Sequence, residues 1–180
     1  MQVIRVLDGP VVVELMSWAG LPLTSAANRP SALSLELPAG VYGDGLLTLP
    51  DVDLADVLTE AIVWDFGQPI GVVGFNAFGD LFLRANEEEA VQYLWLQYGR
   101  GRKVAAGLAS LEALLGPESS ERHKFLEEAA FRVAHSRLGS PPYGSVYTHV
   151  PIPGLGGDGD PQRCEIGKLE AYVSIVSQSI

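Results

Sequence analysis

The chain has 180 residues, of which 47% are hydrophobic and 19% are charged, and its formal net charge is −10. This length and composition allow one domain with a packed core and exclude an intrinsically disordered chain. Nucleic acid binders use cationic surfaces for phosphate contacts, so an acidic chain is not expected to bind nucleic acid. The single cysteine, Cys164, excludes an internal disulfide framework and favours a cytoplasmic location.

No segment is long and apolar enough to predict a membrane span. The most apolar run, residues 11–23, contains Glu14 and a Gly-Leu-Pro break. It falls short of the roughly 20 residues that a helix needs to cross a bilayer. The first ten residues contain no basic leader followed by a long apolar stretch, so no signal peptide is expected. We therefore expect a cytoplasmic protein without a membrane partner.

Residues 1–50 read as a β-rich N-terminal part whose affiliation the sequence leaves open. Residues 3–7 and 11–16 are short apolar runs compatible with strands. Residues 33–38 alternate apolar and polar side chains as a half-buried strand does. The tripeptide at residues 43–45, Gly-Asp-Gly, predicts a turn.

Residues 53–62 are predicted to form an amphipathic helix, with Asp51 as its N-cap. The apolar positions recur at helical spacing and are Leu54, Val57, Leu58, Ala61 and Ile62. The other face carries the acidic residues Asp53, Asp56 and Glu60. Acids near a helix start are favoured by the helix dipole, so a solvated helix face also accounts for them.

Residues 71–106 are predicted to form an antiparallel meander. Strands at 71–75 and 80–84 are joined by a turn at 76–79, whose Asn and Gly tolerate left-handed backbone angles. A third strand at 91–98 follows an acidic bend, and residues 103–106 can pair as a fourth. The aromatic core candidates are Phe75, Phe78, Phe82 and Trp95.

Three helices are predicted after the meander. The first covers 110–116 with Ser110 as its cap, and the second, the longest element, covers 118–138. Its apolar stripe comprises Phe125, Leu126, Ala129, Ala130, Val133, Ala134 and Leu138. The last helix buries Ile166, Leu169, Tyr172, Val173 and Val176. The chain is thus predicted as a single α+β domain, an antiparallel β-meander packed against a long amphipathic helix and a C-terminal helix.

The motifs that could carry chemistry are weak, and no enzyme, cofactor or metal site is predicted. Residues 154–159 fit G-x-G-x-x-G, but no buried strand precedes them and their acids would repel pyrophosphate. His123 and Glu127 lie one turn apart, a spacing that serves surface pairs as well as metals. Cys164 and His149 could in principle meet in space as a nucleophile and its base. The neighbouring Glu165 would raise rather than lower the thiol pKa.

Two stretches of the sequence resemble one family. GFNAFGDLFL, residues 74–83, is similar to the hallmark hairpin of the type VI secretion immunity proteins. In that family the C-terminal domain was long of unknown function, and the usual N-terminal part is GAD-like. Residues 146–178 are similar to its closing pattern of a short strand, a Leu-Gly-Gly loop and an amphipathic helix. The matching positions are Pro151, Leu155, Gly156, Gly157, Lys168 and Gln178. The resemblance spans residues 51–180, and residues 1–50 depart from the family.

The resemblance implies a cytoplasmic immunity protein that binds and neutralises a cognate type VI secreted antibacterial toxin. The prototype pairing in the family is with a DNA-degrading toxin, whose basic groove a carboxylate-rich inhibitor could occlude. From charge alone, the candidate toxin-binding residues are Asp51, Asp53, Asp56, Glu60, Glu87, Glu88 and Glu89. Two alternatives stay open: a small enzyme that reverses a toxin's modification, and a general acidic adaptor protein.

Overall fold

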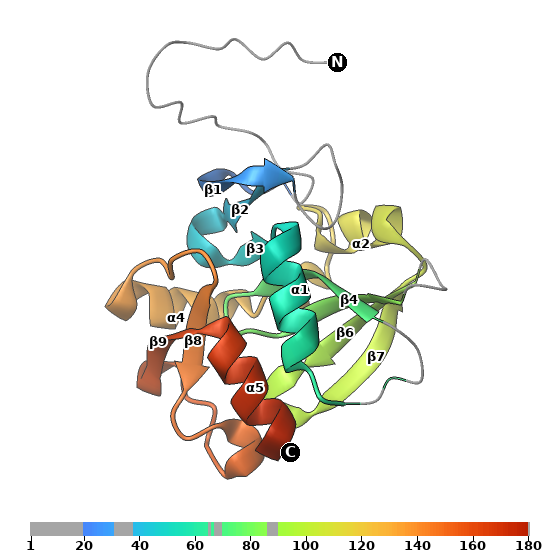
Figure 1. Ribbon diagram of the computed structural model, residues 1–180. Coiled ribbons are helices and arrows are strands. Elements are labelled where there is room, and N and C mark those ends of the chain that lie inside the picture. Colours follow the sequence, from blue (N-terminus) through green and yellow to red (C-terminus); the bar gives the residue numbers. More distant parts are fainter. Residues whose placement is uncertain (1–19, 31–37, 65, 67–69, 86–89, 180) are drawn as a thin grey trace.

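Seven antiparallel strands form the main sheet, and each strand pairs with its neighbour in the chain (Figure 1). The computed structural model describes residues 20–30, 38–64, 66, 70–85 and 90–179. The strands are β1 (Leu23–Pro30), β2 (Pro38–Tyr42), β3 (Leu47–Leu49), β4 (Ile70–Asn76), β5 (Leu81–Ala85), β6 (Val91–Trp95) and β7 (Arg100–Ala105). The predicted α+β class and its meander are confirmed. The apolar runs at 3–7 and 11–16, and nearly all of 33–38, lie outside the described residues.

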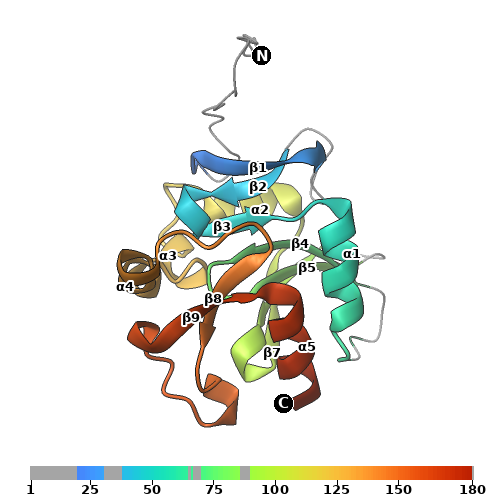
Figure 2. The ribbon, with the colours of Figure 1, turned by 60° about the vertical axis from the view of Figure 1, so that its left-hand side comes forward.

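Helices cover both faces of this sheet (Figure 2). They are α1 (Val52–Ala61), α2 (Leu108–Leu115), α3 (Arg122–Phe125), α4 (Glu128–Leu138) and α5 (Leu169–Ser179). Because side chains alternate along a strand, Phe82 packs with Phe125 and Phe131, beneath α2 to α4. Leu81 and Leu83 point to the other face, where they pack with α1 and α5. The sheet therefore lies between two helical layers.

A second, two-stranded sheet lies beside α5. It consists of β8 (Ser145–His149) and β9 (Cys164–Lys168), joined by a loop that holds the short 3-10 helices η3 (Pro153–Leu155) and η4 (Pro161–Arg163). The loop turns tightly, and a Cβ on Gly157 would overlap the Pro151 carbonyl group. Two further 3-10 turns, η1 (Gly43–Gly45) and η2 (Leu96–Tyr98), connect strands of the main sheet.

The predicted helix after Asp51 is present as α1. The Asp51 carboxylate accepts a hydrogen bond from the Leu54 N–H at 2.9 Å, as an N-cap does. Ala55 and Leu58 are buried against the sheet. Val57, which the sequence predicts on the apolar stripe, is exposed, because it lies at the border of the buried arc.

The long helix predicted at 118–138 is wrong as a single element. Glu127 adopts a left-handed conformation, with φ 49° and ψ 41°, and separates α3 from α4. The helix restarts with a shifted phase, so Phe131 and Ala134 are buried while Ala129 and Val133 are exposed. A non-glycine residue at positive φ costs free energy, and the contact of the Glu127 side chain with Asp80 compensates for it.

Three smaller predictions also differ from the structure. The strand expected at 91–98 ends at Trp95, and its remaining residues form η2. Ser110 lies inside α2, which begins after Gly107 without a side-chain cap. Ile166 belongs to β9 and is 38% exposed, whereas the other four predicted apolar residues of the last helix are buried.

The predicted turn at 76–79 is present and is built around the Asn76 side chain. Its Oδ1 accepts from the Phe78 and Asp80 N–H groups, and its Nδ2 donates to the Phe125 carbonyl group at 3.0 Å. Gly79 has φ +85°, and a Cβ there would lie 2.9 Å from Leu169 Cδ1. The turn therefore requires glycine for its backbone and for the close approach of α5.

We predict that Asn76→Ala lowers the free energy of unfolding by roughly 3 kcal/mol, because several buried polar groups lose their partner together. Urea denaturation monitored by circular dichroism measures this change. Gln178→Ala removes an exposed carboxamide and should change stability by less than about 0.5 kcal/mol. Equal effects of the two substitutions would show that the Asn76 network does not stabilise the fold.

Candidate functional site

The exposed side of α1 combines acidic and apolar side chains. At about 100° per residue, the exposed residues of α1 fall within an arc of about 140°. They are Val52, Asp53, Asp56, Val57 and Glu60, and Val52 is 53% exposed. We call this surface the acidic face of α1. Sequence reasoning identified its acids but missed Val52, although the same helical wheel places it beside Asp56.

The other predicted contact residues lie elsewhere. Asp51 is only 7% exposed, and its carboxylate is engaged as the N-cap of α1. Glu87, Glu88 and Glu89 lie outside the described residues. The structure therefore brings Asp53, Asp56 and Glu60 together on one surface.

An open apolar groove lies on the far side of α5 from α1. The Ser177 hydroxyl donates to the Ala61 carbonyl group at 3.0 Å and joins α5 to α1 on one flank. On its other flank α5 contacts β8 and β9, and the groove lies between them with a volume of about 440 Å³. Its lining includes Val150, Ile152, Leu155, Lys168, Tyr172 and Ile175. We call this surface the apolar groove.

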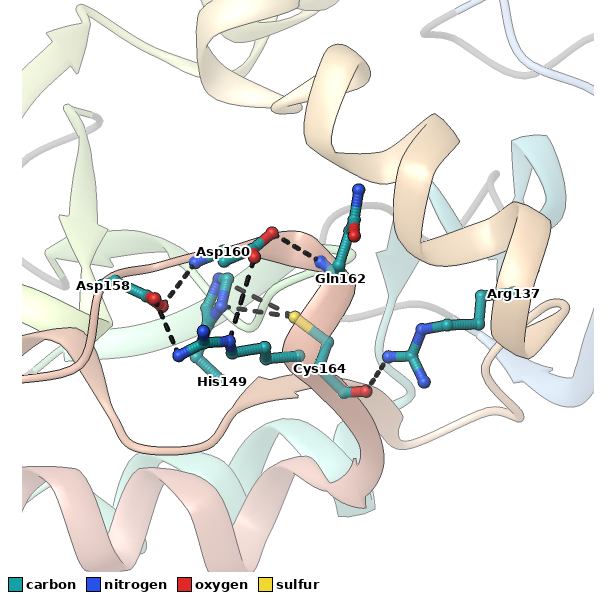
Figure 3. A network of polar contacts seen from close by, with 7 residues as sticks. Arg137, His149, Asp158, Asp160, Gln162 and Cys164 are labelled. Atoms are coloured by element: carbon teal, nitrogen blue, oxygen red, sulfur yellow. Dashed lines mark hydrogen bonds and ion pairs between the residues drawn. The ribbon is translucent and has the colours of Figure 1, made fainter.

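Cys164 and His149 are neighbours in space, as a nucleophile and its base would need to be (Figure 3). They are paired across β8 and β9, and Cys164 Sγ lies 3.3 Å from His149 Nδ1. The adjoining loop is held by polar contacts. Arg163 pairs with Asp158 at 3.0 Å, and Arg137 donates to the Cys164 carbonyl group. The arrangement has the geometry of a catalytic pair, so its protonation decides its chemistry.

Burial keeps both members of this pair neutral. It raises the pKa of the Cys164 thiol to about 11 and outweighs the opposing effect of Arg137. Burial also lowers the pKa of His149. A nucleophilic cysteine requires a thiolate, usually paired with an imidazolium ion. The pair therefore packs as part of the core, where the His149 ring stacks on Phe78 at 5.4 Å.

A second titratable cluster lies beneath α3 and α4. Desolvation raises the pKa values of Asp80 and Glu127, whose carboxyl groups are hydrogen bonded to each other. The hydrogen bond between the two carboxyl groups lowers the pKa of Asp80 and raises the pKa of Glu127. Because Glu127 is the weaker acid of the two, the shared proton resides on Glu127. Perturbed carboxyl pairs often mark active sites, but Asp80 is fully enclosed by Tyr93, Asn76 and the Leu96 N–H. Its role is structural.

Metal sites and membrane-spanning helices can be assessed for residues 20–30, 38–64, 66, 70–85 and 90–179, which the structure describes. Within those residues, no group of three His, Cys, Asp or Glu side chains is arranged to hold a metal ion. His123 is exposed, whereas Glu127 turns toward Asp80, so these two do not form a ligand pair. None of the described helices has the length and apolar character needed to cross a bilayer.

Comparison with known proteins bears on the part of the chain that includes the groove. The model of the family described as T6SS immunity protein Tdi1, C-terminal, matches residues 105–179. The predicted immunity family is confirmed for this segment. The match supports an immunity protein, and we call residues 105–179 the immunity segment. It contains the whole groove and the closing pattern, while the acidic face of α1 and the hallmark hairpin precede it.

Other comparisons concern the fold. The crystal structure of Atu4351 from Agrobacterium tumefaciens is similar to this chain, with a TM-score of 0.63 and 16% sequence identity. The similarity covers 81% of this chain and 72% of that chain. At this identity the similarity shows a shared fold alone. No curated protein matches the chain.

We predict that Cys164 reacts slowly with thiol reagents in the folded protein. Raising the thiol pKa from 9.0 to about 11 lowers the thiolate fraction at pH 8 roughly hundredfold. Reaction with Ellman's reagent, followed in buffer and in guanidinium chloride, measures the difference. Because the chain has one cysteine, its unfolded form is the matched control. Rapid labelling of the folded protein would indicate an activated thiol and restore the enzyme interpretation.

We predict that Glu127→Gln weakens the pH dependence of stability. The folded protein retains a proton on Glu127 up to a pKa of about 8, while the unfolded chain releases it near pH 4.5. The free energy of unfolding therefore falls as pH rises between these values, by at most about 1.4 kcal/mol per pH unit for one proton. A glutamine amide can donate to Asp80 without titrating, so the variant should lose less stability.

Urea denaturation between pH 5 and 8 measures these slopes. Glu112→Gln, which changes an exposed residue of α2, should retain the wild-type slope. Asp80, whose pKa is also raised by burial, accounts for the slope that remains in Glu127→Gln. Parallel curves for wild type and Glu127→Gln would contradict the shared proton.

Proposed function

We propose that this protein is a cytoplasmic immunity protein that binds a cognate type VI secreted toxin and neutralises it without catalysis. The observation that carries the proposal is the match of residues 105–179 to the immunity family. The acidic face of α1 supplies a contact surface of defined charge. Its three carboxylates occur on a helix whose ten residues include no basic side chain.

A partner with a basic surface fits this face best. Acidic groups on a partner would be repelled by the carboxylates of α1. Lys and Arg side chains on a partner would be attracted to them and would raise the association rate. Val52 and Val57 add apolar area that the partner can remove from water. A mixed surface of this kind gives both a rate advantage and a modest gain in affinity.

Occlusion of the toxin's active site is the mechanism that suits this surface. A nuclease must bind phosphates, so its substrate groove is basic and attracts the same carboxylates. An acidic inhibitor seated there competes directly with nucleic acid. We therefore propose a nuclease as the cognate toxin and its substrate groove as the contact site.

The enzyme alternative has less support. The Cys164–His149 pair has suitable geometry, but burial holds its thiol pKa at about 11. A general acidic adaptor would share the charge of α1 but would not require a toxin partner. The binding measurement below separates the adaptor from the immunity protein.

We predict that Asp53→Asn, Asp56→Asn and Glu60→Gln, combined in one variant, slow toxin association about tenfold at low ionic strength. The difference from wild type should shrink toward 0.5 M salt, because exposed charges are then screened within about 4 Å. Surface plasmon resonance with a purified type VI effector from the same genome, carrying an inactivated catalytic site, measures the association rate.

The matched control removes the same charge elsewhere. It combines Asp44→Asn, Glu112→Gln and Glu118→Gln, three exposed acids outside α1. Equal slowing in both variants would show that net charge, and not the acidic face, guides association. Absence of any binding between wild type and the effector would overturn the immunity proposal.

A further inference from the structure

The acidic face of α1 is too small to hold a toxin alone. A helix of ten residues spans about 15 Å, and this one exposes five side chains on its outer arc. A stable protein–protein interface buries roughly 800 Å² on each partner, contributed by about 20 to 30 residues. A partner that binds this face must therefore cover neighbouring surfaces as well.

The surface next to α1 leads across α5 to the apolar groove. Figure 1 shows α5 with α1 on one side and β8 and β9 on the other, and the packing of α5 with all three elements agrees. A partner that extends over α5 from the acidic face therefore reaches the groove. The two surfaces are continuous through the exposed side of α5.

The form of the groove suits protein side chains better than a small molecule. Ile175 is 54% exposed, and Val150 and Leu155 are exposed to a similar extent. A tightly bound small ligand is usually enclosed over 70–90% or more of its surface, so this open groove is expected to hold a small apolar molecule only weakly. Apolar side chains that protrude from a partner gain most of their binding free energy in concave apolar surfaces of this kind.

The charge at the groove differs in sign from that on α1. Among the described residues that line the groove, Lys168 carries the formal charge. The complementary partner segment therefore presents an apolar side chain with a carboxylate beside it. A toxin surface that is basic opposite α1 and apolar with an acid opposite the groove would be fixed in one orientation.

We propose that the apolar groove is the second half of the toxin-binding surface and receives an apolar, acid-flanked segment of the toxin. This inference rests on the proposed immunity function. The acidic face of α1 sets the association rate of the toxin, and the groove sets the dissociation rate of the complex. The groove contribution is apolar, so it persists at salt concentrations that screen the acidic face.

The first experiment measures the groove itself with 1-anilinonaphthalene-8-sulfonate, an apolar dye with one anionic group. The full-length protein should bind it saturably, with a blue shift in fluorescence. Ile175→Ser should weaken dye binding about fivefold, because the lost apolar contact is worth about 1 kcal/mol. Ile166→Ser is the matched control, since Ile166 is an exposed isoleucine of β9 outside the groove lining.

The second experiment adds the same purified, inactivated type VI effector. It should release the dye, and Ile175→Ser should raise the dissociation rate of the complex about tenfold at both low and high salt. Ile166→Ser should leave that rate unchanged. Dye release together with the faster dissociation supports the groove as a toxin contact.

Three results would overturn the inference. They are failure of the native protein to bind the dye, effector binding that leaves the dye in place, and self-association of wild type that Ile175→Ser abolishes. The last result, measured by analytical ultracentrifugation, would assign the groove to a second copy of this chain. In each of these cases, effector binding through the acidic face would leave the proposed immunity function intact. An effector that binds neither wild type nor Ile175→Ser would refute that function.

Discussion

The buried carboxylate of Asp80 is the interaction on which the rest of the structure depends. It accepts hydrogen bonds from the Tyr93 hydroxyl at 2.7 Å and the Leu96 N–H at 2.9 Å, and it shares a proton with Glu127. The hydrogen bond from the Leu96 N–H lies where β6 ends and η2 begins. The contact with Glu127 lies at the break between α3 and α4. A carboxylate without partners could not remain in this core, so the hairpin and the helical layer above it are specified together.

Local sequence patterns correctly predicted the helices and strands whose ends are fixed by residues close in sequence, such as a helix cap or a turn. The α1 helix follows from its cap and apolar spacing, and the hairpin follows from the Asn76–Gly79 turn. The break at Glu127 could not be predicted in this way, because its cause is Asp80, which is distant in sequence. Ile166 was misplaced for a related reason. Its apolar spacing fits a helix, but pairing with Tyr147 places it in β9.

The charged residues of the candidate site could be predicted from the sequence, but the shape of the site could not. Asp53, Asp56 and Glu60 were identified from sequence because charge needs no tertiary information. The apolar groove could not be identified, since Val150 and Leu155 belong to a loop while Ile175 belongs to α5. The sequence predicts that Cys164 and His149 can meet in space, and the pairing of β8 with β9 brings them together. Only the surrounding burial shows that the thiol is held neutral.

The order of the strands in the main sheet also bears on how the chain folds. Every strand of this sheet pairs with its neighbour in sequence, so the pairings close short loops, or at most the segment 50–69 that contains α1, and lose little chain entropy. Docking of α5 onto Leu81 and Leu83 closes a much longer loop and is entropically more costly. We therefore expect the meander to assemble early and α5 to dock late. Because α5 joins the acidic face to the groove, the proposed binding surface would be completed in the final step of folding.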